Sequence, residues 1–215
     1  ARNVIAPVAR DVDDGTCSAT RARQSIIEAS KQCGLYHMTQ LSEFGGLDSG
    51  PLALVVAREA LAGENPRWFS EVFGSRPGVL RDVGEPLRTD YLLPVLAGHK
   101  RGGFGFTESR DAAHYTRAER HGNELVVNGS KSYVTNGVVV DFLNVLADIG
   151  DEGRAFLVID CDARGVSRDR VFESLDGSQH AAFRFEDVRI PLSHMVGTPG
   201  QGMSGAMRQI ADTRL

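Results

Sequence analysis

The sequence predicts an α+β multidomain protein: an N-terminal α-helical bundle, a middle antiparallel β-barrel or sandwich, and the start of a C-terminal helical domain. Apolar residues recur at helical spacing as far as about residue 98. From about residue 102 apolar and polar residues alternate, and turn signals recur roughly every ten residues, as in antiparallel sheets. These changes predict an N-terminal helical domain over 1–101, a middle β domain over 102–202 and a truncated C-terminal helical domain over 203–215.

The helices of the first domain are predicted by three groups of apolar residues, each of which falls on one helix face. The groups are Val4, Ile5, Val8 and Val12; Leu52, Val55, Val56 and Ala60; and Val79, Leu80, Val83 and Leu87. Gly34 is expected to cap the helix that ends near Cys33, and Pro51 is expected to begin the helix that follows.

Short strands are predicted in the second domain, because β-branched and aromatic residues alternate there with polar ones. Their expected ranges are 115–119, 125–127, 132–135, 142–147, 155–159 and 182–188. The pairs Gly122-Asn123 and Asn128-Gly129 are expected to form turns between the first three strands. In the last strand Phe183 and Phe185 should face the core, while the charged residues between and after them face water.

Composition and charge disfavour several classes of protein. The 215 residues include 24 Lys and Arg against 28 Asp and Glu, a net charge of -4 without basic clusters, which disfavours nucleic acid as a partner. No window has the roughly 20 apolar residues of a membrane-spanning helix, and the N-terminus lacks the apolar run of a signal peptide. The three cysteines form no C-x-x-C pair, so neither a disulfide framework nor a zinc site is expected. We therefore expect a reduced, cytoplasmic protein.

The two ends of the chain indicate a longer polypeptide. The first residue is not Met, and the sequence stops at Leu215 inside a predicted helix whose apolar face needs further structure to cover it. We therefore expect a segment of a longer chain, or one half of a split one.

Isolated motifs in this sequence carry weak chemical signals. Gly103-Phe104-Gly105 lacks the third glycine of a dinucleotide fingerprint and precedes strands, which disfavours a Rossmann fold. The Gly-rich loop 197–202 could hold a phosphate at a helix N-terminus, but a flexible linker is favoured. The six histidines lack the spacing of metal ligands, so no metal site is expected. Glu108 and Asp111 could act as an acid and base pair, although a solvated loop is favoured.

Five motifs in a fixed order are more specific than any one of them. They are YLLPVLAG at 91–98, FGFTE at 104–108, NGSKSYVTNG at 128–137, FEDVRIP at 185–191, and VG at 196–197 followed by GQG at 200–202. IAP at 5–7 and EFGG at 43–46 also fall in the expected order, so the match covers nearly the whole chain. In this order of motifs the sequence resembles the acyl-CoA dehydrogenase family.

The resemblance implies an architecture and an activity. It implies a C-terminal four-helix domain, of which only the first turns are present here, and FAD bound between the middle and C-terminal domains. Members of the family remove two hydrogens from Cα and Cβ of an acyl thioester, here one carried by CoA or an acyl carrier protein. An electron-transfer flavoprotein or oxygen would accept the electrons, and a homo-oligomer, either a tetramer or a dimer, is expected.

The resemblance also implies which residues form the site. Hydride transfer to flavin N5 places negative charge on N1 and the C2 carbonyl, so hydroxyl and N–H donors along the ring lower the barrier. The implied cofactor-binding residues are Phe104, Phe106, Thr107, Ala113, Tyr133, Val134 and Thr135. The implied substrate-binding residues are Ala113, Thr213 and Arg214. Some members keep a catalytic Glu at the position that is Thr213 here, and this chain therefore lacks that base. No catalytic residue is identified in this chain, and the base is expected in the missing helices, where most members carry it.

One stretch departs from the family pattern. After Thr107-Glu108 the family usually has Pro and a small Gly/Ala run ending in Gly-Ser-Asp, whereas this chain has SRDAAH over 109–114. Ala113 thereby replaces a serine that approaches the flavin diphosphate and the substrate, and Arg110 could compensate with a charge. Three hypotheses follow: an acyl-thioester dehydrogenase, a flavin-dependent monooxygenase or oxidase on the same fold, and a non-catalytic partner subunit.

Overall fold

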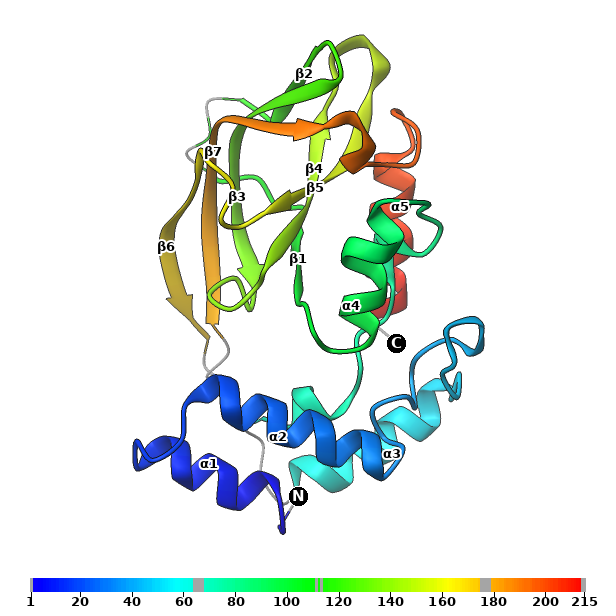
Figure 1. Cartoon of the computed structure of the whole chain (residues 1–215), viewed down its shortest axis with the longest axis vertical. Coiled ribbons are helices and arrows are strands. Elements are labelled where there is room, and N and C mark those ends of the chain that lie inside the picture. Colours follow the sequence, from blue (N-terminus) through cyan, green and yellow to red (C-terminus); the bar gives the residue numbers. More distant parts are fainter. Residues whose placement is uncertain (1, 64–67, 111, 113, 175–178, 214–215) are drawn as a thin grey trace. The chain divides into compact units, whose positions relative to one another are not determined.

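The computed structural model describes residues 2–63, 68–110, 112, 114–174 and 179–213, and its contacts divide the chain into two compact units (Figure 1). The first unit comprises Ala1–Pro77 with Leu96–Gly98, and the second comprises Gly78–Val95 with His99–Leu215. Gly78–Val95 thus belongs to the unit that contains the sheet, although it falls within the predicted first domain. The domain limits at 101/102 and 202/203 stay a prediction.

Three α-helices form most of the first unit. They are α1 over Ile5–Asp13, α2 over Ala19–Gln32 and α3 over Pro51–Ala62, with 3₁₀ turns at Ser42–Phe44 and Phe69–Val72. Ile5 of α1, Ile26 of α2 and Val72 pack into one buried cluster, which joins the two helices to the second 3₁₀ turn. The longest described helix, α2, has 14 residues, and no described helix is long and apolar enough to cross a membrane.

The ends of the helices follow the local sequence. The Ser18 hydroxyl accepts a hydrogen bond of 3.3 Å from the Arg21 backbone N–H and so caps the start of α2. Gly34 takes a φ of +80° after the end of α2, and its N–H donates to the Lys31 carbonyl at 3.1 Å. Pro51 is the first residue of α3. The predicted glycine cap and proline start are both confirmed.

The apolar stripe of α3, predicted as one face of a helix in a bundle, is exposed in the structure. Leu52, Val55 and Val56 are 78%, 52% and 58% exposed. Within the first unit the main described contacts of α3 run to the 3₁₀ turn Phe69–Val72. An element of one turn is too short to cover a three-turn helix face, so the stripe stays open to solvent.

A second predicted helix, over the apolar residues 79–87, is wrong. The observed elements there are a 3₁₀ turn at Gly78–Leu80, a π-helical turn at Arg88–Leu92 and α4 at Leu93–Leu96. Pro86 interrupts the segment, because it lacks the backbone N–H that an α-helix would use at that point. Leu80 and Leu87 are nevertheless buried, and Val79 and Val83 are half-buried, so the apolar residues of this segment still contribute to the core without forming a helix.

One mixed sheet of eight strands forms the body of the second unit, in the order β6-β7-β3-β2-β4-β5-β8 with β1 paired to β4. The strands are β1 Gly102–Gly105, β2 Arg117–His121, β3 Glu124–Thr135, β4 Phe142–Asp148, β5 Arg154–Asp160, β6 Val166–Glu173, β7 Gln179–Pro191 and β8 Met195–Val196. The α+β class is confirmed. The sheet differs from an all-antiparallel one because β1 and β2 run parallel to β4, an arrangement that needs a long connection between the paired strands.

β3 is one long strand where two shorter strands were predicted. The turn at Gly122-Asn123 is confirmed, because His121 pairs with Glu124 across it. Asn128-Gly129 is not a turn: it lies inside β3, where the register against β7 shifts. Gly129 has a φ of +145°, and a Cβ on it would lie 2.5 Å from the Thr116 Cα. The glycine therefore permits a bulge and a close backbone approach.

β7 and β6 show why one strand was predicted and its neighbour was not. Phe183 and Phe185 are 0% and 1% exposed, while Arg184 and Glu186 of β7 face solvent, as the alternation predicts. β6 is exposed along nearly its whole length at the edge of the sheet, so its sequence carries no alternating apolar signal.

The two faces of β4 and β5 pack against different structure. Leu143 and Leu157 belong to the main core of the sheet. On the opposite face Leu146 and Phe156 pack against Ala206 of α5, Gly202–Thr213, the helix that lies along this side of the sheet in Figure 1. The start of α5 also approaches β5 closely, because a Cβ on Gly202 would lie 2.7 Å from the Arg154 carbonyl oxygen.

Candidate functional site

Phe104 and Phe106, both implied at the cofactor, lie at the end of β1 beneath α5. Their rings stack with centroids 5.7 Å apart and 3° between the planes, and Phe104 also stacks on Phe156 at 5.6 Å. Both rings pack against the cluster of Leu146, Phe156 and Ala206. The two rings thus anchor the strand end, and the backbone at Phe106 is one group there that could contact a ligand.

Thr107 leads the chain from this strand end toward solvent. Its side chain is exposed, and its carbonyl accepts a hydrogen bond of 2.8 Å from the Ser132 N–H of β3. This bond places Thr107 beside the segment of β3 that contains Tyr133 and Thr135. The structure thus brings together implied cofactor residues from two separate motifs.

A buried ion pair fixes this arrangement. The Lys131 side chain is 0% exposed; its ammonium pairs with Glu108, and its Nζ lies 3.4 Å from the Phe106 carbonyl oxygen. Glu108 also accepts a hydrogen bond of 3.0 Å from the Thr116 hydroxyl. Burial lowers the pKa of Lys131, and its hydrogen bond with Glu108 opposes that shift. The pair ties the segment on either side of Thr107 to β3.

Sequence reasoning missed Lys131 and misplaced Glu108. A solvated loop was favoured for Glu108, whereas its side chain is only 21% exposed and is engaged by an amine and a hydroxyl. Asp111, its suggested partner, lies outside the described residues. A signal for the ion pair was present, because Lys131 directly precedes the predicted strand 132–135, and a charge that becomes buried in a sheet requires an opposite charge.

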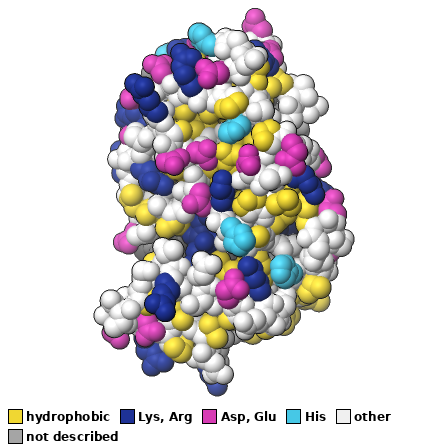
Figure 2. All heavy atoms as spheres, in the orientation of Figure 1, with side chains coloured by type: hydrophobic (Ala, Val, Ile, Leu, Met, Phe, Trp, Pro, Cys, Tyr) yellow, Lys and Arg dark blue, Asp and Glu magenta, His cyan; other side chains and the backbone are white. Residues whose placement is uncertain are grey.

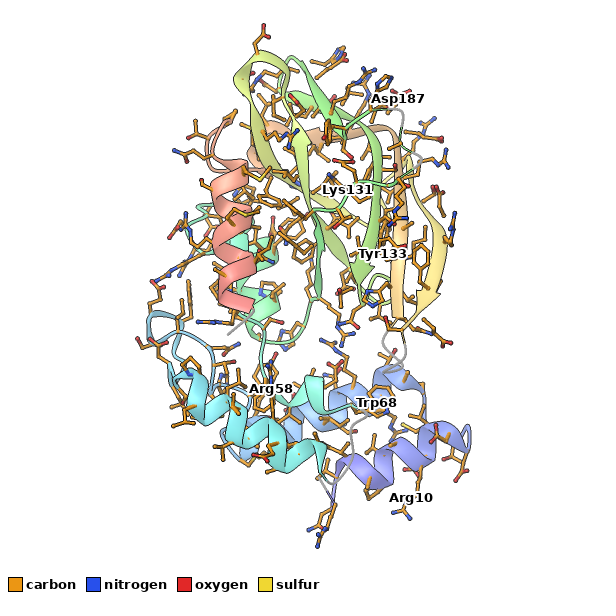
Figure 3. The ribbon with its side chains drawn as sticks, turned by 180° about the vertical axis from the view of Figure 1, so that it is seen from behind. Arg10, Arg58, Trp68, Lys131, Tyr133 and Asp187 are labelled. Carbon is orange, nitrogen blue, oxygen red and sulfur yellow. The ribbon has the colours of Figure 1, made fainter. Side chains whose placement is uncertain are left out.

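Tyr133 and Thr135 face the surface from a bulge in β3. The register against β7 shifts between Lys131 and Val134, and Tyr133 has a φ of +55°, which is uncommon outside glycine. The Tyr133 ring is 55% exposed and stacks on Phe172 of β6 at 4.9 Å. Figure 3 shows Tyr133 beyond Lys131 along the strand. Val134 is buried in the sheet core, so its backbone, and not its side chain, could contact a ligand.

The exposed groups of this region fit the edge and plane of a flavin ring. The Thr107 and Thr135 side chains are exposed, and neither hydroxyl has a hydrogen-bond partner among the residues that the structure describes. Tyr133 adds an aromatic face. A flavin has carbonyl and nitrogen acceptors along one edge and an apolar ring plane, which two hydroxyl donors and an aromatic ring complement.

A hollow of about 290 Å³ adjoins Thr107. Its lining includes the apolar residues Phe106, Leu146 and Met203. Tyr115 and Arg154 also line it, and the Arg154 Cζ lies 4.6 Å from the centroid of the Tyr115 ring. The hollow therefore combines apolar surface with one stacked guanidinium, a composition suited to a small organic ligand with a polar end.

A wider, open groove of about 870 Å³ shares Tyr115 with this hollow. Charges of both signs line it: Arg120 pairs with Glu152 at 2.6 Å, and Arg117 with Glu119 at 3.9 Å. Figure 2 shows Lys and Arg side chains interspersed with Asp and Glu over the visible face of the molecule. The groove therefore presents charges of both signs side by side.

Three implied site residues cannot be placed by their side chains. Ala113 and Arg214 lie outside the described residues, and Thr213 is the last residue of α5, with its side chain outside the description. Their roles stay predictions. In the described part of the chain no group of three or more His, Cys, Asp or Glu side chains could hold a metal ion.

No family model matches the sequence. A short-chain specific acyl-CoA dehydrogenase of Clostridium acetobutylicum is 27% identical over 229 residues, which cover 100% of this chain and 59% of that protein. A cyclohexane-1-carbonyl-CoA dehydrogenase of Syntrophus aciditrophicus is 27% identical over 98% of this chain and 57% of its own length. The crystal structure of a probable acyl CoA dehydrogenase from Mycobacterium abscessus matches with a TM-score of 0.71 and 29% identity, over 89% of this chain and 55% of that one.

The three proteins are all named as dehydrogenases of CoA thioesters, and each match extends over a similar part of the two sequences. The chain spans less than two thirds of the length of these relatives, and the match covers most or all of the chain itself. The resemblance to the acyl-CoA dehydrogenase family is therefore confirmed over most of the chain.

Proposed function

We propose, from this kinship with acyl-CoA dehydrogenases, that the chain carries the N-terminal and middle parts of a FAD-dependent acyl-thioester dehydrogenase. The observation that carries the proposal is the set Thr107, Tyr133 and Thr135. These residues expose two hydroxyls and an aromatic ring at the positions that the resemblance assigns to the flavin. Such a set is not needed by the fold, because none of the three side chains is buried.

Each residue of the set would have a separate role. FAD, when bound, would supply the acceptor for a hydride from Cβ of the acyl group. The Thr107 and Thr135 hydroxyls would donate hydrogen bonds where negative charge develops on the ring. Tyr133 would lie against the ring plane, and the Lys131–Glu108 pair would hold Thr107 in position. The base that takes the α proton would lie outside the described residues.

The remaining features of the proposal rest on the family resemblance. The substrate would be an acyl thioester of CoA or of an acyl carrier protein, and its electrons would pass to an electron-transfer flavoprotein or to oxygen. The protein would act in the cytoplasm as a homo-oligomer, either a tetramer or a dimer. The curated relatives described above are named for CoA thioesters, which favours CoA as the carrier.

The visible spectrum of the protein, purified at its natural length, tests the cofactor first. We expect a yellow protein that releases FAD on denaturation and converts an acyl thioester to its enoyl product. A colourless protein that cannot be reconstituted with FAD would contradict the proposal.

A partner subunit without activity of its own is the second candidate. Glu108, the carboxylate that follows Thr107 in the chain, is engaged by Lys131 and Thr116 and is therefore unsuited to act as a base. Copurification with a second polypeptide that alone restores desaturation would favour this candidate. Rapid reoxidation of the reduced protein by air, with a hydroxylated product, would instead favour a monooxygenase.

A further inference from the structure

Arg154 is a cation without a carboxylate partner among the residues that the structure describes. Arg117, Arg120, Arg184 and Arg189 of the same sheet each form an ion pair. Asp148 lies directly opposite Arg154 in the register of β4 and β5, yet no ion pair joins them in the described part of the chain. The Arg154 guanidinium lies instead over the Tyr115 ring, with its Cζ 4.6 Å from the ring centroid.

The surroundings of this guanidinium indicate a binding role. Arg154 and Tyr115 line the hollow of about 290 Å³ together with Phe106 and Met203, and Thr107 lines it as well. Two carboxylates, Glu108 and Asp148, are also in the lining, but Glu108 is neutralised by Lys131. A stacked guanidinium keeps its planar N–H donors free at its edge, which is the geometry that binds a carboxylate or phosphate with two parallel hydrogen bonds.

We propose that Arg154 and Tyr115 form a subsite for an oxyanion, a carboxylate or a phosphate, on the thioester substrate. This inference rests on the proposed function, because it requires the substrate to lie beside Thr107. Tyr115 would hold the guanidinium in one orientation before the ligand arrives, so less side-chain entropy is lost on binding. Phe106 and Met203 would contact the apolar part of the same ligand.

The oxyanion could come from either end of the substrate. CoA carries phosphates, and an acyl group with a second carboxyl carries a carboxylate. Three thioesters separate these sources: butyryl-CoA has phosphates, glutaryl-pantetheine has an acyl carboxylate, and butyryl-pantetheine has neither.

Calorimetric titration of the protein at its natural length with each thioester tests the subsite. In Arg154→Gln we expect binding of one of the two anionic thioesters to weaken about tenfold or more, because a charge-assisted hydrogen-bonded pair is lost. Binding of butyryl-pantetheine should not change. Arg154→Lys should recover only part of the loss, since an ammonium lacks the planar fork. Arg189→Gln is the matched control, because Arg189 is an exposed arginine of the same sheet that pairs with Glu124 at 3.1 Å.

The outcomes assign the source and separate two kinds of failure. A loss with butyryl-CoA alone assigns the phosphates of the carrier, and a loss with glutaryl-pantetheine alone assigns the acyl carboxylate. If Arg154→Gln binds all three ligands as the wild type does, the subsite is wrong while the proposed function stands. If the wild type binds none of the three, the proposed function fails and the subsite fails with it. Equal thermal melting of the variants and the wild type shows that the fold is intact.

Discussion

At the scale of single residues, Lys131 contributes both to the stability of the fold and to the geometry of the site. Its ammonium has no exposed surface and is compensated by Glu108 and the Phe106 carbonyl. We expect Lys131→Met to lower the free energy of unfolding by about 2–4 kcal/mol, because the Glu108 carboxylate would stay largely buried without its cation. Urea denaturation of the variant measures this loss.

The double variant Lys131→Met with Glu108→Gln distinguishes an unpaired charge from lost packing. Removing both charges should restore part of the stability, because no carboxylate then remains buried without a counter-ion. A double variant no more stable than Lys131→Met would show that the amine stabilises β3 by another means.

Cys161 is a single residue that makes the stability of the protein depend on pH. The thiol packs against the sheet core, and burial raises its pKa to about 11, with Arg168 opposing the shift. Because the folded protein holds this proton more tightly than the unfolded chain, the resulting stabilisation is complete below about pH 9 and is lost as the pH rises toward 11.

Alkylation of Cys161 by iodoacetamide should likewise be slow at pH 8 and rise about tenfold per pH unit to about pH 11. Mass spectrometry of the labelled peptide measures the alkylation rate, with Cys161→Ser as the control. A rate that levels off by pH 9 would contradict the raised pKa.

At the scale of elements, the bulge at Gly129 allows β3 to pass close to Thr116. Gly129→Ala would add a Cβ 2.5 Å from the Thr116 Cα at a φ of +145°. We expect a loss of about 2 kcal/mol or more, from strain and overlap together. Gly122→Ala is the control: its φ is +61°, but nothing lies within 4 Å of the new Cβ, so a loss of only about 1 kcal/mol is expected in urea denaturation. Equal losses would mean that the close approach to Thr116 does not limit the bulge.

The elements that could be predicted from the sequence are those whose pattern reflects one buried face. β7 alternates between core and solvent, and its phenylalanines were assigned correctly. β6 was missed because an exposed edge strand has no apolar period, and β3 was divided because Asn128-Gly129 is also a common hairpin turn. The stripe of α3 has the period of a buried helix, but burial depends on what packs against it, and periodicity cannot supply that.

At the scale of the whole molecule, only those residues of the candidate site that belong to the family's sequence motifs could be predicted. The motifs around Thr107 and Thr135 are separated in the sequence and adjacent in the structure, and the resemblance supplied both. Lys131, Tyr115 and Arg154 were not predicted as a site, because their partners are set by strand register and by the path of the chain between strands. Long-range pairing of this kind has no local signature.

The last prediction is that two residues of the candidate site matter for flavin binding and not for the stability of the fold. Thr107 and Thr135 are exposed, and their hydroxyls have no hydrogen-bond partner within the described residues, so the fold does not depend on them. Replacing both by Val should change the free energy of unfolding without ligand by no more than about 0.5 kcal/mol. Under the proposed function the same change should weaken FAD binding at least tenfold, because two hydrogen bonds to the ring would be lost together. Flavin titration followed by fluorescence measures the second quantity and urea denaturation the first. Ser167→Ala is the control for a general effect of hydroxyl removal, because it removes an exposed hydroxyl of β6 that donates to Asp169, two residues along the same strand. A double variant that keeps its flavin would remove these threonines from the site, and one that loses flavin and stability together would assign them to the fold.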